Sequence, residues 1–234
     1  MIGVYDYTVI LTYLSLASAG TGIVVSLTGG GHPYWGVFFL LLCGLLDAFD
    51  GKVARTKKNR TPLEKSFGIQ IDSLSDLVAF GVLPTVIGIS LLRTSTVLGE
   101  AGLFNEKFFA VAWWAVCLKL LFYTILILYM LAALIRLAYF NVTEEERQRT
   151  EGGARKYFVG VPVTTSALIF PSVLMLHYVL PIDISIAYVP VALVLGIFFV
   201  LRIRVPKPGT KGLLILASLG LLECIAFALC LAFR

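Results

Sequence analysis

Apolar runs long enough to cross a lipid bilayer are the feature that most constrains this chain. The hydrocarbon core of a bilayer is about 30 Å thick, so a helix needs roughly 20 apolar residues to span it. Such runs give approximate spans at residues 8–27, 34–50, 73–92, 112–138, 162–180, 186–201 and 212–233. The sequence therefore predicts an all-α polytopic membrane protein with a single transmembrane domain over residues 1–234.

The composition agrees with this class. Hydrophobic residues make up 59% of the chain and charged residues 14%, whereas about 25% of the residues in a soluble domain are charged. No basic residue precedes the first apolar run, which is itself long enough to span, so we expect no cleavable signal peptide.

The basic residues predict an orientation. Most of the 19 Lys and Arg residues fall in three connections, at 51–71, 136–161 and 202–211, which seven spans would place on one side of the membrane. Because basic connections stay in the cytoplasm, we expect that side and the N-terminus to be cytoplasmic. The net charge of +5 then reflects topology and suits anionic lipid headgroups, and it gives no reason to expect a nucleic-acid partner.

Four aspartates lie where membrane helices rarely carry acids. Asp47 and Asp50 end the second span with i,i+3 spacing, and Asp72 and Asp76 begin the third with i,i+4 spacing. Each spacing puts both carboxylates on one helix face. Since the two spans are consecutive and antiparallel, the acidic faces can meet at one membrane depth.

Carboxylates gathered at one depth would repel one another unless a cation lay between them. Oxygen-only ligands favour Mg²⁺, Mn²⁺ or Ca²⁺ over zinc, and four carboxylates suit two bridged metals. One alternative is that the acids pair with Lys52, Arg55 and their neighbours as solvated helix ends. Another is a cation transporter, although transporter sites usually lie near the middle of the membrane.

Small residues and an arginine accompany the acids. Gly51, Ala54 and Gly68 would let a nucleotide or phosphate approach the backbone, and Arg55 can reach a diphosphate oxygen on the same face. The alternative is that the glycines serve close helix packing.

The complete pattern resembles the CDP-alcohol phosphotransferase family. Its fixed residues are Asp47-x2-Asp50-Gly51-x2-Ala54-Arg55, then Gly68-x3-Asp72-x3-Asp76, with a spacing between Arg55 and Gly68 four residues longer than usual. The resemblance implies a six-helix core, usually dimeric and open to the cytosol, to which the seventh run adds a C-terminal helix. It also implies that the four aspartates bind two divalent cations, Mg²⁺ or Mn²⁺, that Asp76 is the general base, and that Asp50, Gly51, Ala54, Arg55 and Gly68 line the CDP pocket.

A second resemblance concerns the acceptor alcohol. The segments 136–141 and 157–165 look like those of bacterial and archaeal phosphatidylserine synthases, which implies a prokaryotic cell membrane and the substrates CDP-diacylglycerol and L-serine. Glycerol 3-phosphate, inositol phosphate, ethanolamine and choline remain alternative acceptors. Candidate acceptor contacts are Arg136, Asn141, Thr164 and Thr165, and candidate cytidine contacts are Thr8, Thr12 and Ser15. Capping, packing or membrane anchoring is the alternative for each.

Overall fold

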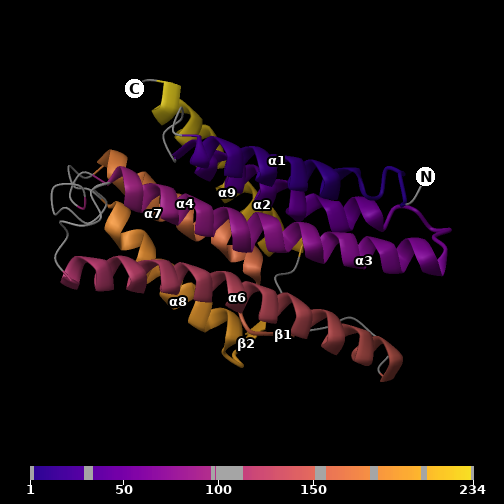
Figure 1. Cartoon of the computed structure of the whole chain (residues 1–234). Coiled ribbons are helices and arrows are strands. Elements are labelled where there is room, and N and C mark those ends of the chain that lie inside the picture. Colours follow the sequence, from indigo (N-terminus) through magenta and orange to yellow (C-terminus); the bar gives the residue numbers. More distant parts are fainter. Residues whose placement is uncertain are drawn as a thin grey trace.

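The computed structural model confirms the all-α class and describes residues 3–28, 34–95, 98, 113–150, 157–179, 184–206 and 210–232. Its helices run mostly along one direction and form a bundle (Figure 1). The helices are α1 (Ile10–Leu27), α2 (Tyr34–Ala54), α3 (Pro62–Leu77), α4 (Leu83–Thr94), α6 (Trp113–Thr150), α7 (Ser166–Val179), α8 (Tyr188–Val200) and α9 (Thr210–Ala232). The span ends predicted at 112, 180 and 233 lie outside the described residues.

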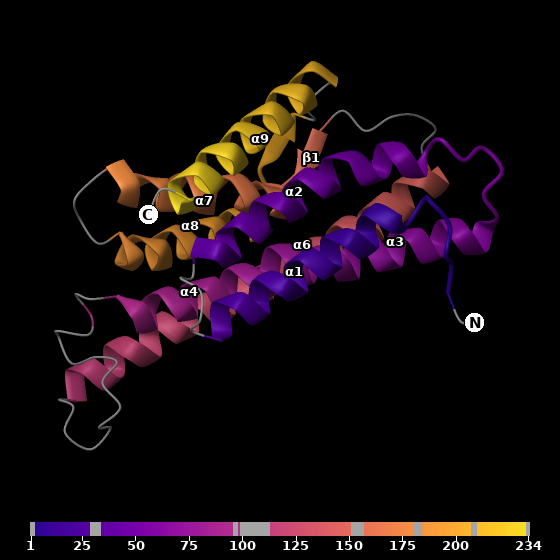
Figure 2. The same ribbon diagram turned by 90° about the horizontal axis from the view of Figure 1, so that it is seen from above.

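The packing order brings α1, α2 and α3 together. Helix α1 lies along α2 and also contacts α3 and α4, while α6 packs on α8. The C-terminal α9 packs on α2 and α7, so it lies beside the second helix of the chain (Figure 2). Ser172 of α7 donates a hydrogen bond of 2.5 Å to Glu223 of α9, which ties this last helix to the bundle.

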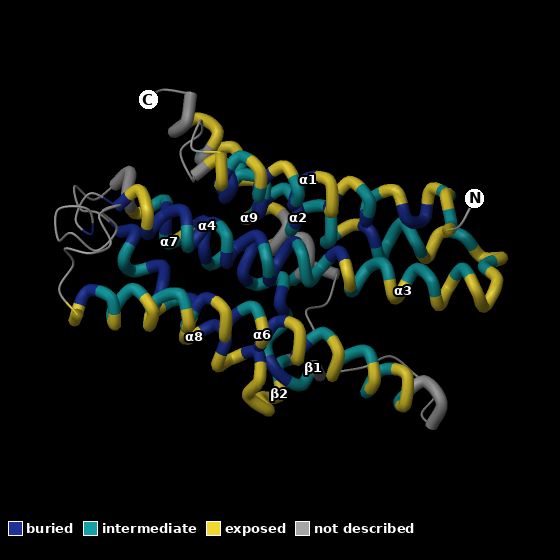
Figure 3. The backbone as a smooth tube through the Cα atoms, in the orientation of Figure 1, coloured by how far each residue is buried: buried dark blue, intermediate teal, exposed yellow. Residues whose placement is uncertain are grey.

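Within the described residues, three helical stretches are long and apolar enough to cross a membrane: Ile10–Leu27, Pro62–Thr94 and Trp113–Arg147. The second of these begins well before the predicted start near Ser73, because Thr61 and Glu64 form a reciprocal capping box and Pro62 occupies the first turn. The early turns of α3 are largely exposed, whereas its continuation into α4 is buried (Figure 3).

A π-helical turn, Val78–Val82, joins α3 to α4 directly after the second aspartate pair. Pro84 has no N–H to offer the Phe80 carbonyl four residues earlier. The Tyr129 hydroxyl of α6 donates to that carbonyl instead, at 2.6 Å, and the Tyr188 hydroxyl donates to the Pro84 carbonyl at 2.8 Å. Two buried tyrosines from distant helices thus stabilise the irregular turn that follows the acids.

A short ribbon ends the connection after α6. Strand β1 (Tyr157–Val159) pairs antiparallel with β2 (Arg204–Pro206). Gly160 follows β1 with a φ of 78°, a left-handed conformation that favours glycine. The ribbon leads into the 3₁₀ turn Val163–Thr165 that begins α7.

Candidate active site

Three aspartates from two helices meet in the structure. Each of Asp47, Asp50 and Asp72 offers a carboxylate oxygen, and these oxygens lie within 4.8 Å of one another. Asp50 is buried, and the other two are half-buried. The i,i+3 spacing on α2 and the antiparallel course of α3 produce this meeting, as the spacing of the acids predicts.

Asp76 lies one helical turn beyond Asp72 on α3. Its carboxylate is close enough to interact electrostatically with Asp47, Asp50 and Asp72. Between them, Ser75 is buried on another face of α3 and donates to the Thr12 carbonyl of α1 at 3.2 Å. This bond fixes α3 against α1 near the acids.

The predicted alternative, in which the acids pair with neighbouring cations, is not what the structure shows. No salt bridge reaches the four aspartates from any Lys or Arg in the described part of the chain. Lys52 instead lies 5.6 Å from the centre of the Phe49 ring, and the Arg55 guanidinium lies against Gly51.

The cluster fits a hard divalent cation. It consists of carboxylate oxygens, is partly shielded from solvent and forms no ion pair with a Lys or Arg among the described residues. Such carboxylates at close range are costly unless a cation is bound, and oxygen ligands select Mg²⁺, Mn²⁺ or Ca²⁺. The donor set is therefore one that could hold a metal.

A cavity of about 340 Å³ opens beside the acids, between α1, α2 and α3. It is lined by all the residues predicted for the CDP pocket, together with Asp72 and two of the three predicted cytidine contacts. The lining is Thr8, Val9, Thr12, Asp50, Gly51, Ala54, Arg55, Arg60, Lys65, Gly68, Ile69 and Asp72. Thr8 precedes α1, and Thr12 lies on its first turn, with its hydroxyl 3.5 Å from Asp50 Oδ2. Ser15 lies outside the lining, and its hydroxyl is buried without a hydrogen-bond partner in the described structure.

Two of the cavity's cations, Arg60 and Lys65, are not among the predicted site residues. In the sequence they serve only as markers of the cytoplasmic side. Their position between Arg55 and Gly68, within the lengthened spacing, is the signal that could have identified them.

The predicted acceptor residues separate into two groups. Arg136 is buried and donates to the carbonyls of Val161 and Gly160 at 3.2 and 3.4 Å. Thr165 caps its own 3₁₀ turn by donating to Pro162, and Thr164 lies in the same turn. Arg136 of α6 thus bonds to the segment between the ribbon and α7, and the two threonines lie in the turn that follows this segment.

Asn141 belongs to the other group, because it lies close to the acids. Its amide donates to the Ser73 hydroxyl of α3 at 2.7 Å. Both side chains line a second cavity of about 430 Å³ between α3 and α6. Lys65, Ile69 and Asp72 line both cavities, so the two spaces adjoin along one face of α3.

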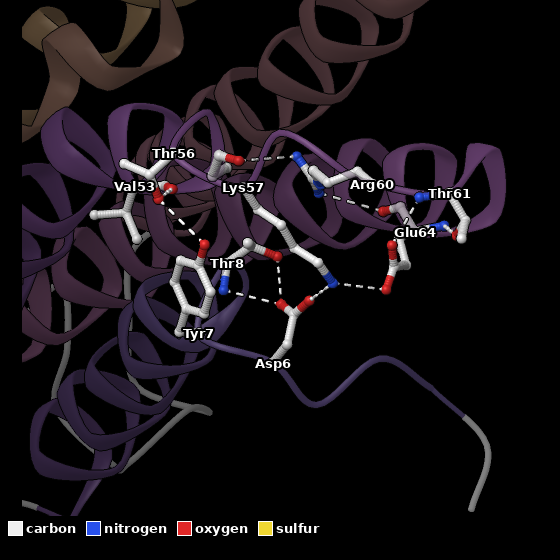
Figure 4. Close-up of polar contacts among 10 residues, drawn as sticks. Asp6, Tyr7, Thr8, Val53, Thr56, Lys57, Arg60, Thr61 and Glu64 are labelled. Carbon is white, nitrogen blue, oxygen red and sulfur yellow. Dashed lines mark hydrogen bonds and ion pairs between the residues drawn. The ribbon is translucent and has the colours of Figure 1, made fainter.

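An ion-paired loop connects α2 to α3 at the mouth of the first cavity. Lys57 Nζ lies 2.7 Å from Asp6 Oδ2 and 2.8 Å from Glu64 Oε1, so one lysine joins the N-terminal segment to the start of α3 (Figure 4). The hydrogen bond from Lys57, with further bonds from Thr8, lowers the pKa of Asp6 to about 2. These carboxylates in turn raise the pKa of Lys57.

The family model for CDP-alcohol phosphatidyltransferases matches residues 8–201 of the chain. The CDP-diacylglycerol–serine O-phosphatidyltransferase of Saccharomyces cerevisiae is 35% identical over 147 residues, which are 62% of this chain and 43% of the yeast protein. A protein of the same name from Helicobacter pylori is 26% identical over 178 residues, 72% of this chain and 62% of its own length. The archaetidylserine synthase of Methanothermobacter thermautotrophicus is 27% identical over 203 residues, 87% of this chain and 70% of its own length. The chain thus spans less than half of the yeast relative's length.

Proposed function

The chain belongs to the CDP-alcohol phosphatidyltransferase family, and from that premise we propose that it transfers a phosphatidyl group from CDP-diacylglycerol to L-serine, giving phosphatidylserine and CMP. The observation that carries this proposal is the acidic cluster of Asp47, Asp50 and Asp72 beside a cavity that also holds Arg55. The names of the relatives support serine as the acceptor.

The two ends of the lipid nucleotide occupy different surroundings. Its cytidine and diphosphate occupy the cavity between α1, α2 and α3, where Arg55 binds a phosphate oxygen. Gly51 and Ala54 leave the backbone of α2 open to the nucleotide, and Thr8 and Thr12 offer hydroxyls from the α1 side. The chain is an integral membrane protein with long apolar helices, so the acyl tails remain in the surrounding lipid.

The reaction itself is a direct displacement. Asp76 accepts the proton of the serine hydroxyl on a carboxylate oxygen, and the serine oxygen bonds to the phosphorus that carries the diacylglycerol. The bond from that phosphorus to the bridging oxygen breaks, and CMP leaves with the electron pair. When bound at Asp47, Asp50, Asp72 and Asp76, two divalent cations, Mg²⁺ or Mn²⁺, would offset negative charge on the diphosphate.

We further propose that the acidic end of the bundle faces the cytoplasm of a prokaryotic cell, as the basic connections indicate, and that the protein is a homodimer, as the family resemblance implies. Among the predicted acceptor residues, Asn141 lines a described cavity together with Asp72, and this supports a place for it beside the acceptor. We therefore expect substitution of Asn141 to affect serine binding more than substitution of Arg136, Thr164 or Thr165 does.

CMP release by the purified protein tests the proposal. The protein is supplied with CDP-diacylglycerol, Mg²⁺ or Mn²⁺, and serine, glycerol 3-phosphate, inositol phosphate, ethanolamine or choline in turn. Release with serine alone is the expected result. Release with glycerol 3-phosphate but not with serine would reject serine as the acceptor and leave the phosphatidyl transfer standing. If none of the alcohols causes CMP release, the proposed transfer is rejected.

The lipid donor has a second candidate. Of the three relatives, the one that shares the largest part of both chains is named archaetidylserine synthase. The same assay is therefore run with an isoprenoid ether analogue, CDP-archaeol, in place of CDP-diacylglycerol. A higher kcat/KM with CDP-archaeol would identify that lipid as the donor.

A further inference from the structure

Arg60 occupies an unusual place in the loop between α2 and α3. It lines the cavity beside the acids, although it lies outside the family's fixed pattern. Its two terminal nitrogens lie 3.5 Å from the Ala54 carbonyl and 3.3 Å from the Glu64 carbonyl. Its Nε is buried and has no hydrogen-bond partner in the described structure. The guanidinium is therefore held in place while part of its hydrogen-bonding capacity stays unused.

Gly68 provides the space that Arg60 fills. A Cβ added at Gly68 would lie 2.6 Å from Arg60 Nη2, and the other atom within 4 Å is Cζ of the same side chain. Gly51 has a similar relation to Arg55, whose Nη1 would lie 3.5 Å from an added Cβ, an ordinary contact. Each glycine of the pattern thus faces one guanidinium, and the fit at Gly68 is the tighter one.

The loop that carries Arg60 is fixed at both of its ends. Lys57 binds Asp6 before α1 and Glu64 in the first turn of α3, and Thr61 caps that turn (Figure 4). Arg60 lies between these anchors in sequence and bonds to carbonyls on both α2 and α3. The connection between α2 and α3, residues 55–61, therefore forms a strap that holds Arg60 at the cavity.

We propose that Arg60 binds the diphosphate of the cytidine nucleotide as a second guanidinium beside Arg55, in a position that the missing side chain of Gly68 leaves open. The inference rests on the proposed function for the identity of the ligand. Arginine suits the role because its planar fork matches phosphate oxygens. The two long bonds to backbone carbonyls are ones that a phosphate can replace or share.

Nucleotide binding by purified protein tests this role without any turnover. The affinities of CDP and of cytidine are measured with Mn²⁺ present, the second by competition against CDP. Arg60→Ala is expected to weaken CDP about tenfold or more, as loss of a charge-assisted bond would, and to leave cytidine within about twofold. Arg60→Lys should recover part of the CDP affinity. Lys58→Ala is the matched control, because Lys58 is a cation of the same loop that does not line the cavity.

A double-mutant cycle tests the link to Gly68. Gly68→Ala alone should weaken CDP as Arg60→Ala does, since the added methyl group displaces the guanidinium. In the Arg60→Ala background the same methyl group meets free space, so the second substitution should add little. Additive losses would mean that the methyl group blocks the nucleotide itself, which would overturn the role given to Gly68.

The outcomes separate this inference from the proposed function. Equal losses of CDP and cytidine affinity in Arg60→Ala would show that Arg60 only shapes the loop, and an unchanged CDP affinity would show that it does not touch the diphosphate. Either result overturns the inference. Failure of serine to release CMP from the wild-type protein would reject the acceptor and leave the binding measurements interpretable.

Discussion

Two groups of carboxylates lie at the same end of the bundle and are treated in opposite ways. Asp6, before α1, and Glu64, in the first turn of α3, share the loop residue Lys57, and both lie within hydrogen-bonding distance of it. In the cluster, Asp47, Asp50 and Asp72 approach one another without an ion pair to any Lys or Arg of the described residues. The loop group is complete as it stands, whereas the cluster is electrostatically incomplete until something positive binds. The ion-paired acids therefore stabilise the fold, and the acids without an ion pair indicate a binding site.

The largest expected difference between the groups is in turnover. Asp76→Asn should lower kcat about 10²- to 10⁴-fold, because an amide cannot accept the hydroxyl proton. Asp6→Asn makes the same chemical change outside the cluster and should keep kcat within about threefold of wild type. CMP release measures both variants. Turnover close to wild type in Asp76→Asn would remove it as the base.

The second expected difference is in the sign of a stability change. Without metal, Asp50→Asn should raise the melting temperature, because it removes one charge from a repelling group. Asp6→Asn should lower the melting temperature, because it breaks an ion pair.

Mn²⁺ should reverse the order of the melting temperatures of the wild type and Asp50→Asn, so that the wild type becomes the more stable protein. Wild-type protein should gain about 2.7 kcal/mol at a metal concentration about 100 times Kd, whereas Asp50→Asn should gain much less. Thermal unfolding in detergent, with and without Mn²⁺, measures all three proteins. A lower melting temperature for metal-free Asp50→Asn, with its metal response intact, would contradict the account of the cluster.

A smaller effect is expected from opening the strap. Lys57→Met removes both ion pairs of the loop, which are partly exposed and hence weak. CDP affinity should fall about twofold to fivefold, since Arg60 loses its anchor while keeping its charge. Lys58→Met removes the same charge from the same loop and serves as the control. Equal losses in the two variants would assign the effect to net charge alone.

The smallest effect is a titration. A carboxyl group with a lowered pKa contributes stability above its usual value near 3.8, and that stability is lost as the pH falls through the folded value, about 2. The strap should therefore be unaffected by pH between about 5 and 8. Carbon NMR of the Asp6 carboxyl should show titration near pH 2 in the wild type and closer to the usual value in Lys57→Met. An identical titration in both proteins would mean that Lys57 does not hold Asp6.

Much of the fold follows from the apolar runs, because a bilayer fixes the length that a helix must have. Hydropathy predicts the apolar span that starts near residue 73 but not the helical turns of α3 before it, since these turns depend on the capping box that Thr61 and Glu64 form around Pro62. Pro84 is a local signal for the π-helical turn, but the stabilisation of the turn is not visible in the sequence. It depends on hydroxyls from Tyr129 and Tyr188, which the chain brings in from other helices.

The site also combines features that local sequence predicts with features that depend on contacts between distant segments. The i,i+3 and i,i+4 spacings of the acids are local, so the helix faces that the acids occupy can be predicted from sequence alone. The lengthened spacing marks Arg60 as a candidate, but the placement of its side chain cannot be predicted, because it depends on how Lys57 joins the loop to Asp6. The buried bonds of Arg136 to the Gly160 region are equally invisible in the sequence, since they join segments that only the fold brings together.

The central claim is that aspartates of α2 and α3 hold a divalent cation next to a nucleotide diphosphate. Anomalous diffraction from crystals grown with Mn²⁺ and CDP tests it most directly. The account predicts manganese peaks bounded by Asp47, Asp50 and Asp72, with the diphosphate beside them. Bound CDP with no manganese at these carboxylates would contradict it.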